Sequence, residues 1–236
     1  METVQNMIKT EEEISKIKTA QAITHKVFLG ALAKIKAGIT ELELVAEINA
    51  DFIKSGAEET AFDTIVAFGG NTADVHHVPT DRELAKNELV MIDLGAKKDG
   101  YCSDMTRTFC YGAPSTEITK VYNAVLEAQQ RTLRYLKAGM TGKEADAIAR
   151  EYLRACGYDK EFCHTLGHGV GVVVHEQPRL ANYCDEVLAE NMVVTVEPGV
   201  YIEGFGGVRI EDMVVIKKDG IENLTECDKK LIIQKD

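Results

Sequence analysis

The spacing of apolar residues predicts a long helix near the start of the chain. Apolar side chains recur every three or four positions, at Ile14, Ile17, Ala20, Ile23 and Val27. This period places them on one face of a helix. Thr10 and Glu13 precede that face with the spacing of a capping box, in which each side chain accepts a hydrogen bond from the other residue's backbone N–H. We therefore expect the helix to begin directly after Thr10.

The same start signal occurs in two further segments, as Thr40 with Glu43 and as Thr141 with Glu144. The amphipathic runs that follow stop at a glycine, Gly56 in the first segment and Gly157 in the second. Glycine often ends a helix because it adopts the left-handed conformation at little cost. Residues 118–136 form another amphipathic run ahead of the last capping box, so we expect two helices in each half of the chain.

Short apolar runs after the helices predict strands. Residues 65–68 form a buried strand followed by a turn at residues 69–71. We expect one hairpin in the first half and a matching hairpin in the second: residues 89–94 with 101–109 around Asp99-Gly100, and residues 193–200 with 208–216 around the loop 204–207. Helices and antiparallel strands that do not alternate one for one favour an α+β fold over a doubly wound sheet.

The chain also repeats its own sequence. Residues 36–40, Lys-Ala-Gly-Ile-Thr, recur as Lys-Ala-Gly-Met-Thr at residues 137–141, an offset of 137 − 36 = 101 positions. We therefore predict two similar halves, about 10–112 and 113–236. In each half an apolar strand ends in a carboxylate and a second carboxylate follows on the other arm of the hairpin, namely Asp93 with Asp104, and Glu197 with Glu211.

Four acids at matched positions indicate a metal centre between the halves. A single acid at a strand end is usually a solvated turn residue, but Asp93 and Glu197 each end an apolar run that should be buried. Four buried anions repel one another unless cations hold them together. His168, which lies between two glycines, is a candidate fifth ligand. Four carboxylates and a neutral imidazole would balance two divalent ions.

The predicted ligand set suggests the kind of metal and of chemistry. Oxygen-rich ligands favour Mn, Co, Fe or Mg-like ions over a thiolate-type zinc site. Two such ions lower the pKa of a bridging water and polarise a carbonyl group, which is the logic of two-metal hydrolysis.

Composition limits the classes of protein to consider. The 236 residues are 45% hydrophobic and carry a formal net charge of -11, which suits one large domain or two fused halves and disfavours a nucleic-acid partner. The six cysteines form no CxxC pair, residues 1–13 lack the apolar core of a signal peptide, and no apolar stretch is long enough to cross a membrane. We expect a cytoplasmic protein with reduced thiols.

The motifs resemble those of the pita-bread metallopeptidases, in the proline-peptidase branch that contains prolidase and aminopeptidase P. They lie at residues 92–95, 103–108, 164–176, 195–199 and 207–212. The resemblance implies a pita-bread fold, with two pseudo-symmetric halves around a curved antiparallel sheet, and a single catalytic domain over residues 1–236. It also implies that the extra N-terminal domain of longer relatives is absent, and leaves open whether the chain is a stand-alone short form or an excised catalytic domain.

The resemblance also assigns roles to the candidate residues. It implies two divalent metal ions, manganese first and cobalt, zinc or iron as alternatives. Asp93 would bind one ion, His168 and Glu197 the other, and Asp104 and Glu211 would bridge both. Glu197 would also act as a general base.

Further residues would bind the substrate. His76, His164 and His175 would contact it, His76 and His175 with catalytic roles, and Arg209 would orient Asp93. The alternative for His76 is a surface loop residue, and for His175 a histidine of the core. We expect its neighbour His77 to point away. Asp74 departs from the branch, which more often has an apolar residue there.

The function implied is hydrolysis of the bond between an N-terminal residue and proline, in peptides or in Xaa-Pro dipeptides. His164, four positions before His168, and Arg209, two positions before Glu211, favour the proline branch over the methionine aminopeptidases of the same fold. A non-catalytic scaffold protein that kept the fold is the alternative from another class. The partners implied are peptide substrates, and a homodimer is one assembly that the resemblance allows.

Overall fold

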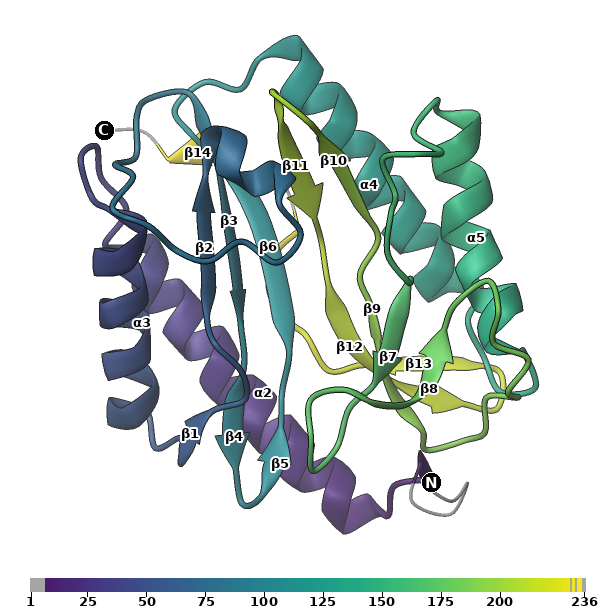
Figure 1. Cartoon of the computed structure of the whole chain (residues 1–236). Coiled ribbons are helices and arrows are strands. Elements are labelled where there is room, and N and C mark those ends of the chain that lie inside the picture. The colour runs from purple at the N-terminus through teal and green to yellow at the C-terminus, as the bar shows by residue number, and fades with distance from the viewer. Residues whose placement is uncertain (1–6, 230, 232, 235–236) are drawn as a thin grey trace.

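In the part of the chain that the structure describes, two pairs of helices flank a set of mostly antiparallel strands, and each half of the chain contributes one pair (Figure 1). The computed structural model of the protein describes residues 7–229, 231, 233 and 234. The sequence predicts no signal-peptide core in residues 1–13, and the first six of these residues lie outside the described part.

The predicted helix starts of the first half are confirmed. Helix α2 (Glu11–Leu32) begins after Thr10, and helix α3 (Glu41–Lys54) begins after Thr40, both with a complete capping box. Gly56 follows α3 with a φ of 90°, the left-handed conformation expected of a helix-ending glycine.

The second half repeats this arrangement. Helix α4 (Thr116–Tyr135) starts two residues earlier than the pattern predicts, because the side chain of Ser115 accepts a hydrogen bond from the backbone N–H of Ile118. Helix α5 (Gly142–Ala155) begins after Thr141 with a complete capping box, and Gly157 follows with a φ of 91°.

The first-half sheet has the strand order β14-β6-β3-β2. Strand β3 (Glu88–Leu94) pairs antiparallel with β2 (Ile65–Phe68) and with β6 (Met105–Tyr111), and the two-residue β14 (Ile233–Gln234) is parallel to β6. A smaller sheet joins β1 (Glu59–Thr60), β4 (Ala96–Lys98) and β5 (Tyr101–Cys102).

The predicted hairpin of the first half therefore consists of two consecutive pairings, β3 with β6 and β4 with β5. Asp99 and Gly100 make the tight turn between β4 and β5, with φ of 50° and 78°.

The second-half sheet has the order β13-β12-β9-β7-β8. Its strands are β7 (Gly167–Gly169), β8 (Glu176–Leu180), β9 (Val193–Val196), β12 (Asp212–Lys217) and β13 (Gly220–Asn223). Strands β10 (Gly199–Ile202) and β11 (Gly206–Arg209) form a separate hairpin that extends the β9–β12 pair.

Two local predictions need correction. The loop of this hairpin is shorter than the predicted residues 204–207, because Gly206 and Gly207 pair with β10. The turn predicted at residues 69–71 is part of a 3-10 helix, η1 (Gly69–Ala73).

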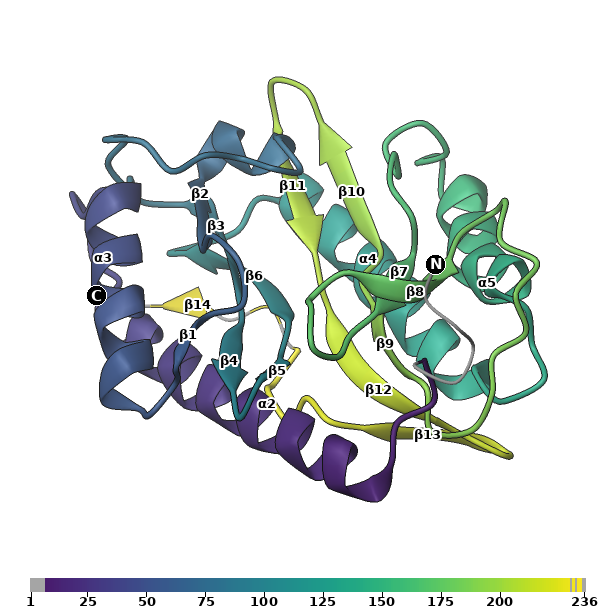
Figure 2. The same ribbon diagram turned by 60° about the horizontal axis from the view of Figure 1, so that its bottom comes forward.

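The helices cover the outer sides of the strands and leave the inner ends of the hairpins to face each other. Figure 2 shows α2 and α3 against the first-half sheet, and α4 and α5 on the far side of the second-half strands. Separate apolar clusters fill the two halves, around Phe28 and Phe109 in one and around Tyr122 and Phe162 in the other. Among the described residues, no helix combines the length and apolarity needed to span a membrane.

Candidate metal centre

Strand register brings the two acids of the first half to one side of the sheet. Asp93 on β3 lies opposite Thr106 on β6. Side chains two positions apart on a strand point to the same face, so Asp104, just ahead of β6, lies on the side of Thr106 and Asp93. Asp104 is only 4% exposed.

The second half places its acids in the same way. Val196 of β9 lies opposite Asp212 of β12, so Glu197 and Glu211 are adjacent to this pair. The backbone N–H of Glu211 donates to the carbonyl oxygen of Thr106, at 3.1 Å. This bond joins the two halves directly at the site.

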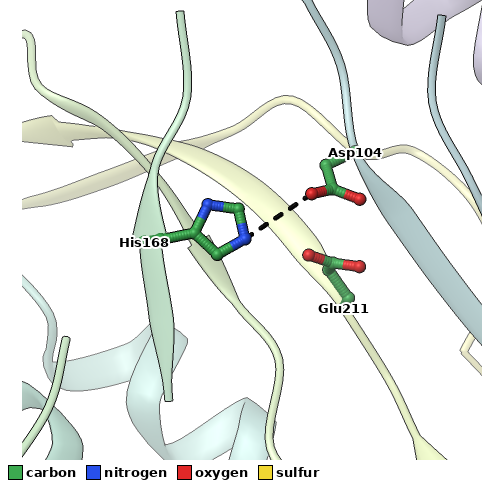
Figure 3. A group of neighbouring side chains, drawn as sticks. All are labelled: Asp104, His168 and Glu211. Atoms are coloured by element: carbon green, nitrogen blue, oxygen red, sulfur yellow. Dashed lines mark ion pairs between the residues drawn. The ribbon is translucent and has the colours of Figure 1, made fainter. Parts of the chain in front are cut away.

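His168 on β7 completes the cluster. Asp104, His168 and Glu211 each present a ligand atom within 4.8 Å of the others, and all three are buried. Figure 3 shows the imidazole facing the two carboxylates. Its Nε2 lies 3.6 Å from Oδ2 of Asp104 and 3.1 Å from Oε1 of Glu197. All the ligand types predicted from the sequence therefore meet in this region.

Two threonines hold the carboxylates in place. The hydroxyl of Thr106 donates to Oε2 of Glu211 at 2.8 Å, and the hydroxyl of Thr195 donates to Oε1 of Glu197 at 2.9 Å. The Thr195 oxygen also accepts the backbone N–H of His168 at 3.0 Å. These contacts fix the direction of the carboxylates before any ligand binds, as second-layer hydrogen bonds do in metal sites.

The remaining polar atoms fit a divalent cation. Within the described part of the chain, Oδ1 of Asp93 and Oε1 of Glu211 are buried without a hydrogen-bond partner. Nδ1 of His168 lies 3.1 Å from the carbonyl oxygen of Gly169, so the imidazole can keep its proton on Nδ1 when Nε2 gives up a proton to bind a metal ion. Buried carboxylate oxygens without partners are costly by themselves and are satisfied by a metal ion.

The electrostatics agree with this interpretation. Burial and the charges of Glu211, Asp93 and Glu197 raise the pKa of Asp104 well above its usual range. Burial and the charges of Glu197 and Asp93 do the same to the pKa of Glu211. Burial also raises the pKa of Asp93, although Arg209 opposes the shift.

Glu197 differs from the other three acids. Burial alone would raise its pKa, but the hydrogen bond with His168 and the positive charge of Arg209 outweigh it and lower the pKa to about 2. Glu197 is therefore the acid held most firmly as an anion.

A cavity of about 520 Å³ opens over the cluster. It is lined by the five predicted ligands, by the predicted substrate residues and by several residues that the sequence did not single out: Asp93, Asp104, His168, Glu197 and Glu211; His76, His164, His175 and Arg209; and Phe62, Asp63, Ile65, Val75, Thr165 and Arg179. The structure thus brings together every predicted site residue.

Tyr201 on β10 is a central residue that the sequence analysis missed. Its hydroxyl accepts a 2.7 Å hydrogen bond from Nη1 of Arg209 and lies 3.0 Å from Nε2 of His164. The sequence signal that could have revealed Tyr201 is a pair of glycines that leave room for its side chain. A Cβ at Gly199 would lie 2.5 Å from the tyrosine oxygen, and one at Gly207 would lie 2.7 Å from the tyrosine ring.

His76 and His77 have different surroundings. His76 is exposed and lines the cavity, and its backbone N–H donates to the side chain of Asp74 at 3.1 Å. His77 turns away, as expected, and its Nε2 lies 2.8 Å from Oε2 of the fully buried Glu41. Glu41 is a second residue that the sequence did not reveal.

His175 lies beside the cluster, with its ring centroid 4.4 Å from that of His168. Burial and the positive charges of His168 and Arg179 lower its pKa to about 4. His175 is therefore neutral near pH 7. The residues after it form strand β8, so His175 and Glu176 do not begin a helical His-Glu-x-x-His zinc motif.

Comparison with known proteins gives consistent matches along the chain. The profile of metallopeptidase family M24 matches residues 15–218. The chain is 45% identical to a Xaa-Pro dipeptidase of Pyrococcus furiosus over 226 residues, which cover 96% of this chain and 65% of the relative.

Solved structures give the same result. An X-Pro aminopeptidase of Thermotoga maritima superposes with a TM-score of 0.95 at 45% identity, covering 98% of this chain and 65% of that chain. A Xaa-Pro dipeptidase of Bacillus anthracis superposes with a TM-score of 0.96 at 44% identity, with the same coverage. The pita-bread fold predicted from the motifs is thereby confirmed, and the chain spans 65% of the length of these relatives.

Proposed function

Because the chain belongs to metallopeptidase family M24, we propose that it is a metal-dependent peptidase that hydrolyses the Xaa-Pro bond. Its substrates are peptides with proline in the second position, or Xaa-Pro dipeptides. The observation that carries the proposal is the convergence of acids from both halves, with His168, on the floor of one cavity.

We assign the metal ligands from the donor set. Asp93, Asp104, His168, Glu197 and Glu211 would hold two divalent ions, with manganese preferred and cobalt, zinc or iron as alternatives. When bound, such ions activate water and polarise a carbonyl group. The two carboxylate oxygens without hydrogen-bond partners, on Asp93 and Glu211, support this assignment.

The other residues of the cavity bind and orient the peptide. His175 is neutral near pH 7 because its pKa is about 4, so it keeps one N–H that can donate to the scissile carbonyl oxygen as negative charge develops there. His164 is also neutral, since burial lowers its pKa. His76 contacts the substrate from the exposed loop above the cavity.

Glu197 has two assigned roles, ligand and proton acceptor. Both roles need the anionic form, which its pKa of about 2 ensures. The same low pKa makes it a weak base, and a general base works best with a pKa near the working pH. The ligand role is therefore the better supported of the two.

Selectivity for proline rests on the relatives. The Pyrococcus protein is named Xaa-Pro dipeptidase, and the Thermotoga structure is named X-Pro aminopeptidase. Both are longer than this chain. The net charge of -11 suits neutral or cationic peptides better than nucleic acid.

The test is turnover by the purified chain after metal removal and addition of Mn, Co, Zn or Fe(II). Xaa-Pro dipeptides, Xaa-Pro-Yaa tripeptides and Met-Ala peptides are assayed side by side. We expect proline substrates to be hydrolysed and the His175→Ala variant to be impaired. The His25→Ala variant, on α2 and away from the cavity, serves as control. Hydrolysis of Met-Ala peptides alone would indicate a methionine aminopeptidase, and absence of turnover and of bound metal would indicate a scaffold.

A further inference from the structure

A buried ion pair joins the segment ahead of α2, residues 7–10, to Glu176 at the start of β8. Nζ of Lys9 lies 2.8 Å from Oε2 of Glu176, and the two side chains are only 4% and 10% exposed. Lysine and glutamate are rarely buried to this extent unless they are paired. Burying both charges costs free energy, so the position of the pair calls for an explanation.

Lys9 is held in place by its backbone. Its N–H donates to the carbonyl oxygen of Asn191 at 2.9 Å, and the preceding residue, Ile8, forms a β-bridge with Met192. Figure 2 shows this segment rising from the start of α2 toward β8. The segment ahead of α2 thus belongs to the second-half sheet, whereas α2 itself covers the first half.

Glu176 in turn shapes the β7–β8 loop, residues 170–175. Its Oε1 accepts the backbone N–H of Val173 at 3.2 Å. A Cβ at Gly171 would lie 2.4 Å from the carboxylate, so the carboxylate packs directly on that backbone. Val172 and Val173 at the tip of the loop are 54% and 52% exposed, and apolar packing therefore contributes little to the shape of the tip.

The loop ends at His175, immediately before Glu176. His175 is the last residue of the loop and Glu176 is the first residue of β8. His175 lines the cavity beside His168, while the carboxylate of the adjoining Glu176 binds Lys9. The direction of His175 is therefore coupled to the carboxylate that Lys9 binds.

We propose that Lys9 and Glu176 are positioning residues for His175, and that the segment ahead of α2 supports the catalytic cavity. The inference rests on the proposed function for the role of His175. Lys9 neutralises Glu176 and fixes its carboxylate, the carboxylate fixes the β7–β8 loop, and the loop sets the direction of the imidazole. Neither residue touches the substrate.

The experiment measures three variants, Lys9→Met, Glu176→Gln and the double variant Lys9→Met/Glu176→Gln. The Lys18→Met variant is the control. The control breaks the Lys18–Glu222 pair, whose side chains are 45% and 40% exposed. All proteins are loaded with Mn and assayed on a Xaa-Pro dipeptide well below their melting temperatures, with rates expressed per folded, metal-loaded chain.

Each single variant should lose about ten- to hundredfold in kcat, because small displacements of a catalytic group have effects of this size. The metal content and KM should change little. The double variant should recover most of the activity, because it leaves no unpaired buried charge and the glutamine oxygen can still accept the Val173 N–H. The Lys18→Met control should match the wild type.

A spectroscopic measurement separates positioning from stability. In the metal-free proteins, the six histidines give a simple long-range ¹H–¹⁵N spectrum, in which Lys9→Met should shift the His175 ring signals and leave those of His25 in place. If a single variant does not fold, the double variant carries the test. Wild-type kcat with an unmoved His175 signal in Lys9→Met, or a double variant as impaired as the single ones, would overturn the proposal. Absence of wild-type turnover would instead refute the proposed function, and the His175 signals would still report on the coupling.

Discussion

Nη2 of Arg209, on β11, donates a 2.6 Å hydrogen bond to Oδ2 of Asp93, at the end of β3. The ion pair joins the second half of the chain to the first, and both side chains are largely buried, 3% and 13% exposed. The same guanidinium contacts Tyr201 and Thr106. The Arg209 guanidinium thereby fixes Asp93, a cavity-lining acid whose other oxygen, Oδ1, is buried without a hydrogen-bond partner.

Replacing Arg209 by methionine should strongly destabilise the metal-free chain. It leaves the buried Asp93 unpaired, and breaking a buried pair on one side costs about 3–5 kcal/mol. The double variant Asp93→Asn/Arg209→Met should recover part of this stability without recovering turnover. Urea unfolding in the presence of a chelator measures the first effect and a Xaa-Pro assay the second. An Arg209→Met variant as stable as the wild type would contradict the structure.

The Tyr201→Phe substitution removes a single hydroxyl that links Arg209 to His164. We expect a loss of about 1–2 kcal/mol in unfolding free energy, because a buried donor loses its partner. We also expect a several-fold fall in kcat/KM, since both partners line the cavity. Tyr183→Phe is the matched control, because Tyr183 is 70% exposed. Equal effects of the two substitutions would argue against the role of Tyr201.

The features that the sequence predicts correctly are local or repeated. The capping boxes at Thr10, Thr40 and Thr141 involve residues three positions apart, so nothing distant has to be known. The four acids are recognisable because the duplication places them at equivalent ends of strands. Their convergence follows from strand register, which alternation of apolar residues already suggests.

The features that the sequence does not predict depend on contacts between distant segments. Glu41 looks like an ordinary acid in the first turn of a helix, yet it is fully buried under residues 68–80. Tyr201 looks like an ordinary strand residue until the packing of Gly199 and Gly207 is known. Lys9 lies 167 positions from its partner Glu176. No periodicity or short motif reports such pairings.

Glu41 gives a prediction about pH. Its carboxylate accepts hydrogen bonds from the backbone N–H of Phe68 and of Thr80, and it binds His77. Burial raises its pKa, but these contacts outweigh burial and lower the pKa below the ordinary value of 4.5. The anion therefore stabilises the fold at pH values above about 4.5, and this contribution is lost as the pH falls through the folded-state pKa.

The Glu41→Gln variant should accordingly be less stable than the wild type by about 2–3 kcal/mol at pH 7, since several charge-assisted hydrogen bonds are weakened. The difference should shrink as the pH falls below about 4.5. Urea unfolding at several pH values measures it. The exposed Glu190→Gln variant serves as control and should behave like the wild type throughout. A difference that does not depend on pH would mean that packing, and not the charge of Glu41, causes the loss.

Asp104 gives the most direct test of the metal centre. In the metal-free chain, Asp104→Asn should be at least as stable as the wild type at pH 8, because burial and the neighbouring charges of Glu211 and Asp93 disfavour the Asp104 anion. Addition of Mn should reverse the order. At a metal concentration one hundred times Kd, the wild type should gain about 2.7 kcal/mol for each site, and the variant should gain little.

Thermal unfolding with and without Mn, together with the metal content per chain, measures the effect. Asp159→Asn, at an exposed position, is the control. If Asp104→Asn bound two ions per chain and gained as much stability as the wild type, Asp104 could not be a bridging ligand.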